Sequence, residues 1–120
     1  MKHDARYAAW LNVADELEAF RLFLYEKSGY WHQPSEGYQV DQFLRSAKWL
    51  RRRCAKGWWY WWDRGWFGGV ASEPLHTLYR FIGDAGGEYE SNPEGRAVIA
   101  RADALQLRID RLSKGDVLSK

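Results

Sequence analysis

The chain has 120 residues with a formal net charge of +2, and 46% of its residues are hydrophobic and 28% charged. A chain of this length and apolar content can bury one core without metal ions, and its single cysteine cannot form an internal disulfide. The amino terminus lacks the apolar stretch of a secretory signal, and no uncharged stretch near the tryptophans approaches the roughly 20 residues that span a bilayer. We therefore expect a single cytoplasmic domain without a membrane-spanning segment.

The first predicted helix covers residues 4–27. Its apolar residues recur at alternating spacings of three and four, the pattern of an amphipathic helix with one buried face. They are Trp10, Val13, Leu17, Phe20 and Leu24. Asp4 can cap the start, and Gly29 can take the left-handed conformation that ends helices. Residues 28–38 combine two glycines, a proline and two serines, which predicts a loop.

A second helix is predicted over residues 39–56, extending to residue 62 if Gly57 does not end it. Its apolar face contains Val40, Phe43, Ala47, Leu50 and Cys54. A helix that continues through Gly57 adds Trp58 and Trp61 to this face, because the spacing is maintained. A chain that turns at Gly57 leaves the stretch WWYWW free to be extended, since aromatic residues also favour strands.

The glycines at positions 65, 68 and 69 predict a loop over residues 64–72 in either case. Ser72 as a cap and Pro74 in the first turn then predict a third helix over residues 73–83.

A last helix is predicted over residues 93–113, which Asn92 and Pro93 open in the order expected at a helix start. Its apolar stripe contains Val98, Ala102, Leu105, Ile109 and Leu112. No alternating strand pattern competes convincingly with these helices. The sequence therefore predicts an all-α, single compact domain of four to five helices, either a bundle or an orthogonal array.

Basic residues are concentrated in the second predicted helix. Between Gln42 and Trp62 there are six basic residues and no acidic one, so the rest of the chain carries a formal charge of about −4. Cations and tryptophans mix on the helix face opposite the apolar stripe, and tryptophan and arginine are enriched in protein interfaces. The candidate partner-binding residues are Arg45, Lys48, Trp49, Arg52, Arg53, Lys56 and Trp59.

Within this set, Trp49 and Trp59 are the candidate hot spots. The alternative interpretation is a central helix contacted on two sides, in which the aromatic rings pack and the basic stems extend past them. Complete burial of all eight tryptophans would strain a core this small. We therefore expect at least one or two tryptophans to be substantially exposed.

Motifs for catalysis or cofactor binding are missing from the sequence. Cys54 and the histidines at positions 3, 32 and 76 have none of the spacings of zinc sites, and the glycine clusters do not form a phosphate loop. Cys54 lies on an apolar stripe, which favours an inert buried thiol over a nucleophile. We therefore expect no metal, no cofactor and no enzymatic activity.

In general character, as a short single domain with charge and aromatic residues on one surface, the chain resembles small phage-encoded inhibitors such as helical anti-CRISPR proteins. The resemblance implies a protein that binds and blocks a host defence effector without chemistry. The function expected from the residues is a protein interaction module for a partner with an acidic surface. Nonspecific nucleic-acid binding by the same basic and aromatic residues is the alternative, and exposed aromatic residues also leave self-association open.

Overall fold

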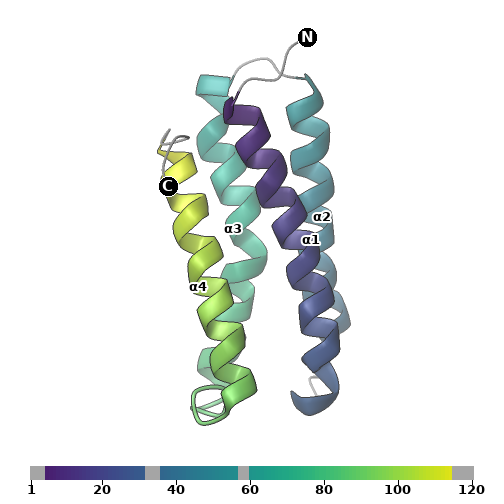
Figure 1. Ribbon diagram of the computed structural model, residues 1–120, viewed down its shortest axis with the longest axis vertical. Helices are drawn as coiled ribbons and strands as arrows, with labels where there is room; N and C mark the ends of the chain where they lie inside the picture. The colour runs from purple at the N-terminus through teal and green to yellow at the C-terminus, as the bar shows by residue number, and fades with distance from the viewer. Residues whose placement is uncertain (1–4, 32–35, 57–59, 115–120) are drawn as a thin grey trace.

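The computed structural model describes residues 5–31, 36–56 and 60–114, and side chains within residues 7–26, 40–56 and 65–114. The described residues form four helices: α1 (Ala5–Trp31), α2 (Glu36–Lys56), α3 (Tyr60–Asp84) and α4 (Pro93–Ser113). Successive helices run antiparallel, so that α1 begins and α4 ends at the same end of the molecule (Figure 1). The predicted all-α single domain is confirmed, and its architecture is a four-helix bundle.

The bundle is elongated, with extents of 45 × 25 × 19 Å. Each helix packs against its neighbours in chain order, and α4 also contacts α1. The predicted apolar stripes of α1, α2 and α4 form the interior, where Phe20 meets Phe43 with ring centroids 5.1 Å apart. Trp10 is fully buried and contacts Phe67 of α3 edge to face, with ring centroids 5.5 Å apart. The periodicity therefore identified the buried face of these three helices correctly.

Helix α4 has the predicted bounds and the predicted cap. The Asn92 side chain accepts hydrogen bonds from the backbone N–H groups of Glu94 (2.8 Å) and Gly95 (3.4 Å), which satisfies two donors of the first turn. In the preceding turn Gly86 and Gly87 have φ angles of 64° and 91°, a conformation that other residues rarely adopt.

The predicted loop over residues 28–38 is too long. Helix α1 continues to Trp31 and α2 already begins at Glu36. Gly29 therefore lies inside the last turns of α1, where glycine costs only about 1 kcal/mol relative to alanine. Residues 32–35, the central part of the predicted loop, lie outside the described residues, and the predicted bounds of the loop were wrong.

The largest correction concerns α3, which includes both the predicted loop over residues 64–72 and the predicted short helix over residues 73–83. A buried stripe at helical spacing runs through both segments. It contains Phe67, Ala71, Leu75, Leu78 and Ile82. Burial of this stripe outweighs the roughly 1 kcal/mol that each helical glycine costs. Glycine content was therefore a misleading signal here.

The predicted end of the second helix at residue 56 is confirmed, whereas its alternative continuation to residue 62 is not. Helix α2 ends at Lys56 and the antiparallel α3 begins at Tyr60, so no single helix extends to residue 62. The extended interpretation is also wrong for residues 60–62, which are helical. Trp58 and the side chain of Trp61, predicted to continue the core stripe, lie outside the described residues.

Pro74 lies in the interior of α3 rather than in a first turn. Proline has no N–H, so the carbonyl of Val70 one turn earlier loses its intrahelical donor. Ser46 of α2 replaces it, because its buried hydroxyl donates to the Val70 carbonyl oxygen over 2.8 Å. Ser72, predicted as a cap, is buried and accepts a hydrogen bond from Gln106 Nε2 (2.9 Å) instead.

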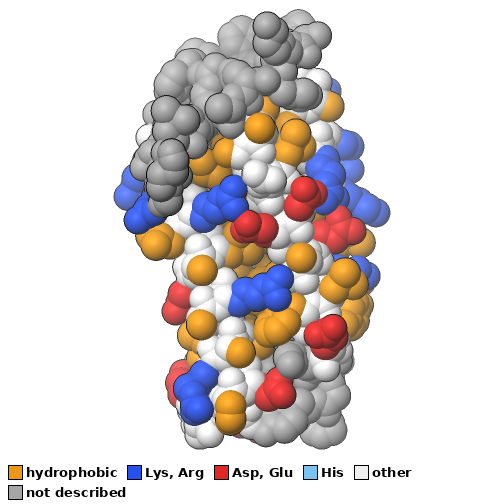
Figure 2. All heavy atoms as spheres, in the orientation of Figure 1, with side chains coloured by type: hydrophobic (Ala, Val, Ile, Leu, Met, Phe, Trp, Pro, Cys, Tyr) orange, Lys and Arg blue, Asp and Glu red, His pale blue; other side chains and the backbone are white. Residues whose placement is uncertain are grey.

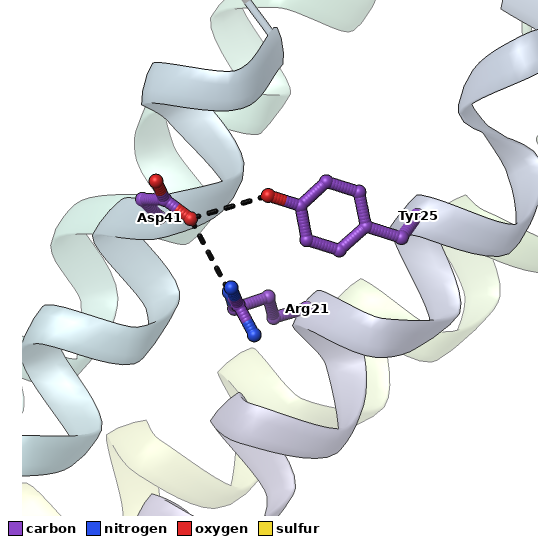
Figure 3. A network of polar contacts seen from close by, with 3 residues as sticks. All are labelled: Arg21, Tyr25 and Asp41. Atoms are coloured by element: carbon purple, nitrogen blue, oxygen red, sulfur yellow. Dashed lines mark hydrogen bonds and ion pairs between the residues drawn. The ribbon is translucent and has the colours of Figure 1, made fainter.

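Polar contacts near the ends of α1 and α2 also join these two helices. Asp41 of α2 accepts hydrogen bonds from Arg21 Nε and the Tyr25 hydroxyl of α1, both over 3.3 Å (Figure 3). Within the described part of the chain, no helix has the length and apolarity needed to cross a membrane.

Candidate functional site

The outward face of α2 carries a stripe of exposed cations. Arg45, Lys48, Arg52 and Lys56 follow one another at spacings of three, four and four residues and are all exposed. The opposite face of α2 is buried in the core, as the periodicity predicts. We call these four residues the basic stripe. Four of the seven predicted site residues are therefore displayed together on one solvent-facing surface.

Beside the basic stripe, α2 and α3 together form an aromatic cluster that we define as Trp49, Arg53 and Trp66. The rings of Trp49 and Trp66 lie 5.3 Å apart between centroids, and the Arg53 guanidinium lies 5.6 Å from the centroid of Trp66. Trp49 also contacts the buried Phe67 edge to face, with centroids 5.6 Å apart. Ring contacts thus connect the exposed Trp66, through Trp49, to Phe67 in the core.

The two tryptophans differ in exposure, and this changes the predicted hot spots. Trp49 is half-buried, whereas Trp66 is 57% exposed. Trp66 therefore presents more aromatic surface to solvent than Trp49 and confirms that at least one tryptophan is substantially exposed. Trp59, the second predicted hot spot, lies outside the described residues. Arg53 is half-buried beneath the ring it contacts.

Sequence reasoning missed Trp66 because it placed this residue in a loop. The signal that could have found it is the helical spacing of the apolar residues from Phe67 to Ile82, which makes the preceding residue part of α3. Trp66 then lies next to the buried stripe, on the side of α3 that packs against α2.

Two glycines leave the backbone of α3 uncovered beside Trp66. Gly65 and Gly69 are exposed, and a Cβ atom added to either would meet no atom within 4 Å. Gly68 is different, because its Cβ would lie 2.8 Å from Ser113 Cβ and closer still to Ser113 Oγ. Gly68 thus permits close packing of α3 on α4, whereas Gly65 and Gly69 face open space.

The cations of α2 differ in how they are paired. Arg51, which faces α1, donates to Asp15 and Glu18, each over 2.8 Å, and the hydrogen bond to Asp15 raises its pKa. Among the described residues, Lys48, Arg52 and Lys56 have no ion-pair partner. Because their charge is not neutralised by neighbouring helices, the basic stripe has a positive potential available to another molecule.

On the face that Figure 2 shows, the described side chains of α1 and α4 have no such concentration of charge. Acidic and basic side chains lie interspersed on it (Figure 2). One of its pairs is Arg108 of α4 with Glu16 of α1, at 2.5 Å. The concentration of cations on α2 is therefore a local property and not a property of the whole surface.

A groove with a volume of about 270 Å³ lies between α2 and α3. Its lining residues are Gln42, Arg45, Ser46, Trp49, Val70 and Glu73. The groove adjoins both the basic stripe and the aromatic cluster, because Arg45 belongs to the first and Trp49 to the second. Together, the stripe, the cluster and the groove form one candidate interaction surface.

Cys54 has none of the properties of a nucleophile. It is buried, as predicted, and burial raises the pKa of its thiol from 9.0 to about 12. Its Sγ lies 3.9 Å from the Tyr7 carbonyl oxygen as a weak donor. In the described part of the chain, no group of three histidine, cysteine or carboxylate side chains is placed to hold a metal ion.

Comparison with known proteins finds no matching family model, no matching curated protein and no matching solved structure. The class of the molecule is therefore defined by its own geometry, as a four-helix bundle with a basic and aromatic surface on α2 and α3.

Proposed function

We propose that this protein is a non-enzymatic interaction module that binds an acidic surface of another protein through the basic stripe and the aromatic cluster. The observation that carries the proposal is the exposure of Trp66, which contacts Trp49 and Arg53 of α2. The same helix carries the basic stripe, in which Lys48, Arg52 and Lys56 have no ion-pair partner among the described residues. Large aromatic residues and arginine are the commonest hot spots of interfaces, because they bury much area from a rigid side chain.

Charge and aromatic area have separate roles in this proposal. Lys48, Arg52 and Lys56 attract an acidic partner over a distance of about a Debye length and so accelerate the encounter. Trp66 then loses contact with water and slows dissociation. Its contacts with Trp49 and Arg53 hold the ring in place before binding, which lowers the entropy lost on association.

The resemblance to small phage-encoded inhibitors suggests a more specific role for the protein. On this proposal it acts in the host cytoplasm and blocks a defence effector by covering an acidic surface of that effector. Steric blocking of this kind needs affinity and no catalytic group.

Nonspecific nucleic-acid binding is a second candidate, favoured by the exposed cations of α2 together with the exposed, stackable ring of Trp66. Its weakness is the small number of cations, since affinity for phosphates grows with each one neutralised. Arg51 is already engaged by Asp15 and Glu18. A stripe of four cations therefore supports only weak, strongly salt-dependent binding to nucleic acid.

Selection of a phage-displayed library of random short peptides on the purified protein tests the proposal. We expect enrichment of peptides rich in Asp and Glu, and about 30-fold weaker binding of these peptides to Trp66→Ala, which corresponds to roughly 2 kcal/mol. The double variant R52E/K56E should lower the association rate about 10-fold or more. No enrichment of acidic sequences, or equal binding to both variants, would refute the proposal.

A matched control for charge reversal is R80E/K114E, which makes the same change in charge at two exposed positions, one in α3 and one directly after α4. It should leave peptide binding unchanged. Titration with single-stranded and double-stranded oligonucleotides at low salt, followed by tryptophan fluorescence, separates the two candidates. Nucleic-acid binding predicts quenching that Trp66→Ala removes, and an absence of quenching excludes it.

A further inference from the structure

The turn between α3 and α4 is the acidic counterpart of the basic stripe. From residue 84 to residue 94 the chain has four acidic residues and no basic one, whereas α2 has cations and no acidic residue after Asp41. Asp84, Glu88 and Glu90 are exposed, and none of these side chains has an ion-pair partner among the described residues. Their negative charge is therefore available to another molecule, as is the positive charge of the basic stripe.

The turn holds its carboxylates in defined positions. Tyr89, which lies between Glu88 and Glu90, is 2% exposed. Its ring contacts Phe81 edge to face, with ring centroids 6.3 Å apart, while both neighbouring side chains stay exposed. Arg96 Nη1 donates a hydrogen bond to the carbonyl oxygen of Glu90 over 3.1 Å. A segment that is ordered in this way loses little conformational entropy when it binds.

The basic stripe and the acidic turn are too far apart to neutralise each other within one molecule. Trp66 of α3 lies beside Trp49, in the stretch of α2 that carries the stripe. Asp84, at the other end of α3, lies about 27 Å further along the helix axis at a rise of about 1.5 Å per residue. The turn is therefore at the opposite end of the bundle from the end of α2 (Figure 1). Exposed charges separated by more than about 10 Å are largely screened at 0.1 M salt.

Opposite charges on separate surfaces allow two copies of the chain to bind head to tail. The cations without a partner in the described structure are Lys48, Arg52 and Lys56, and the acidic turn offers an equal number of such carboxylates. Single exposed ion pairs contribute little, whereas several pairs between ordered groups act together. The two surfaces differ from each other, so the contact is heterologous, and each molecule keeps one stripe or one turn for a further copy.

We propose that the basic stripe binds the acidic α3–α4 turn of a second copy of this chain in a weak head-to-tail self-association. The second copy covers the surface that an acidic partner would use, so self-association and partner binding exclude each other. The inference rests on the proposed function, because it uses the affinity of the stripe for carboxylates, and it adds a second occupant for that surface. The contact should dissociate at high salt, where the Debye length decreases to about 3 Å at 1 M.

Analytical ultracentrifugation of the full chain at low ionic strength, up to millimolar concentration, measures the self-association. We expect the average mass to rise above the 14.1 kDa of the monomer with increasing protein concentration, and to return to that value at high salt. The variants R52Q/K56Q and E88Q/E90Q each neutralise one side of the contact. Each should weaken self-association roughly 10-fold, the effect of two exposed ion pairs. Circular dichroism verifies that both variants are folded.

An equimolar mixture of the two variants tests whether the contact joins stripe to turn. R52Q/K56Q keeps an intact turn and E88Q/E90Q keeps an intact stripe, so one contact of the original kind can form between them. We expect a 1:1 heterodimer with the affinity of the unaltered contact and no larger species, because the remaining stripe and turn are both neutralised. The mixture also controls for net charge and for folding, since each variant must contribute an intact surface.

The outcomes separate this inference from the proposed function. A monomeric unaltered protein at millimolar concentration and low salt, or a mixture that associates no more than either variant alone, overturns the self-association. The acidic peptides selected by phage display then test the stripe by itself. Weaker binding of these peptides to R52Q/K56Q than to the unaltered protein supports the proposed function even without self-association. Equal binding to both proteins refutes the proposed function.

Competition completes the test. If the copies associate through the stripe, the same acidic peptides should lower the average mass of the unaltered protein towards that of the monomer. Self-association that saturating peptide leaves unchanged would show that the copies meet through another surface, and it would overturn the inference.

Discussion

Replacement of Ser46 by alanine tests how the bundle tolerates a proline inside α3. The Ser46 hydroxyl is buried and donates to the Val70 carbonyl, which Pro74 has deprived of its intrahelical donor. Its loss leaves a buried carbonyl without a partner, which costs about 1–3 kcal/mol of the free energy of unfolding. For a domain of this size that corresponds to a decrease in Tm of roughly 4 °C per kcal/mol.

A double-mutant cycle with Pro74→Ala tests whether the proline makes the Ser46 hydrogen bond necessary. An alanine at position 74 restores an N–H that can donate to the Val70 carbonyl within α3. In that background we expect Ser46→Ala to cost less than about 1 kcal/mol, because the carbonyl already has a donor. Urea denaturation followed by far-UV circular dichroism measures all four proteins. An equal cost of Ser46→Ala in both backgrounds would refute the proposed exchange of donors.

Three further predictions concern stability and reactivity. Gly69→Ala should raise the free energy of unfolding by about 1 kcal/mol, because the added Cβ atom has open space. Gly68→Ala should lower the free energy of unfolding by about 1 kcal/mol or more, because the added Cβ atom overlaps with Ser113. Thermal unfolding of the two variants compares them directly. Trp66→Ala should cost less than about 1.5 kcal/mol in the same measurement, since this side chain is exposed and loses mainly one aromatic contact. Because burial raises the pKa of Cys54 from 9.0 to about 12, stability should decrease as the pH rises from 9.0 towards 12, and a thiol reagent at neutral pH should label Cys54 only after unfolding. Rapid labelling of the folded protein, or constant stability across this pH range, would contradict the burial of the thiol.

Helix α4 could be predicted from the sequence because the signals that define it are local. Its cap residue, its first-turn proline and its apolar stripe are all set by residues close in sequence, and the structure has the predicted bounds. Helix α3 illustrates the opposite case. Its glycines and Pro74 indicate a loop and a helix start when considered locally, but Phe67 and Leu75 are buried by packing against other helices, and this tertiary contribution dominates.

Part of the candidate site could likewise be predicted from the sequence, and part of it could not. The basic stripe follows from helical spacing alone, so the structure places it as expected. The pairing of Arg51 with Asp15 and Glu18 depends on which face of α2 meets α1, and that was not readable from local sequence. Trp66 was missed for the same reason, because its position beside Trp49 requires the antiparallel packing of α2 and α3.

The order of the helices determines how the protein can be attached to a surface or a probe. The turn between α3 and α4 lies at the end of the bundle opposite the end of α2, and therefore far from the carboxyl-terminal half of the basic stripe (Figure 1). Glu88 is exposed in that turn, so a cysteine introduced there by Glu88→Cys provides a reactive handle, while buried Cys54 stays protonated. Immobilisation through position 88 therefore places the attachment point at the opposite end of the bundle from the carboxyl-terminal end of α2 and the start of α3.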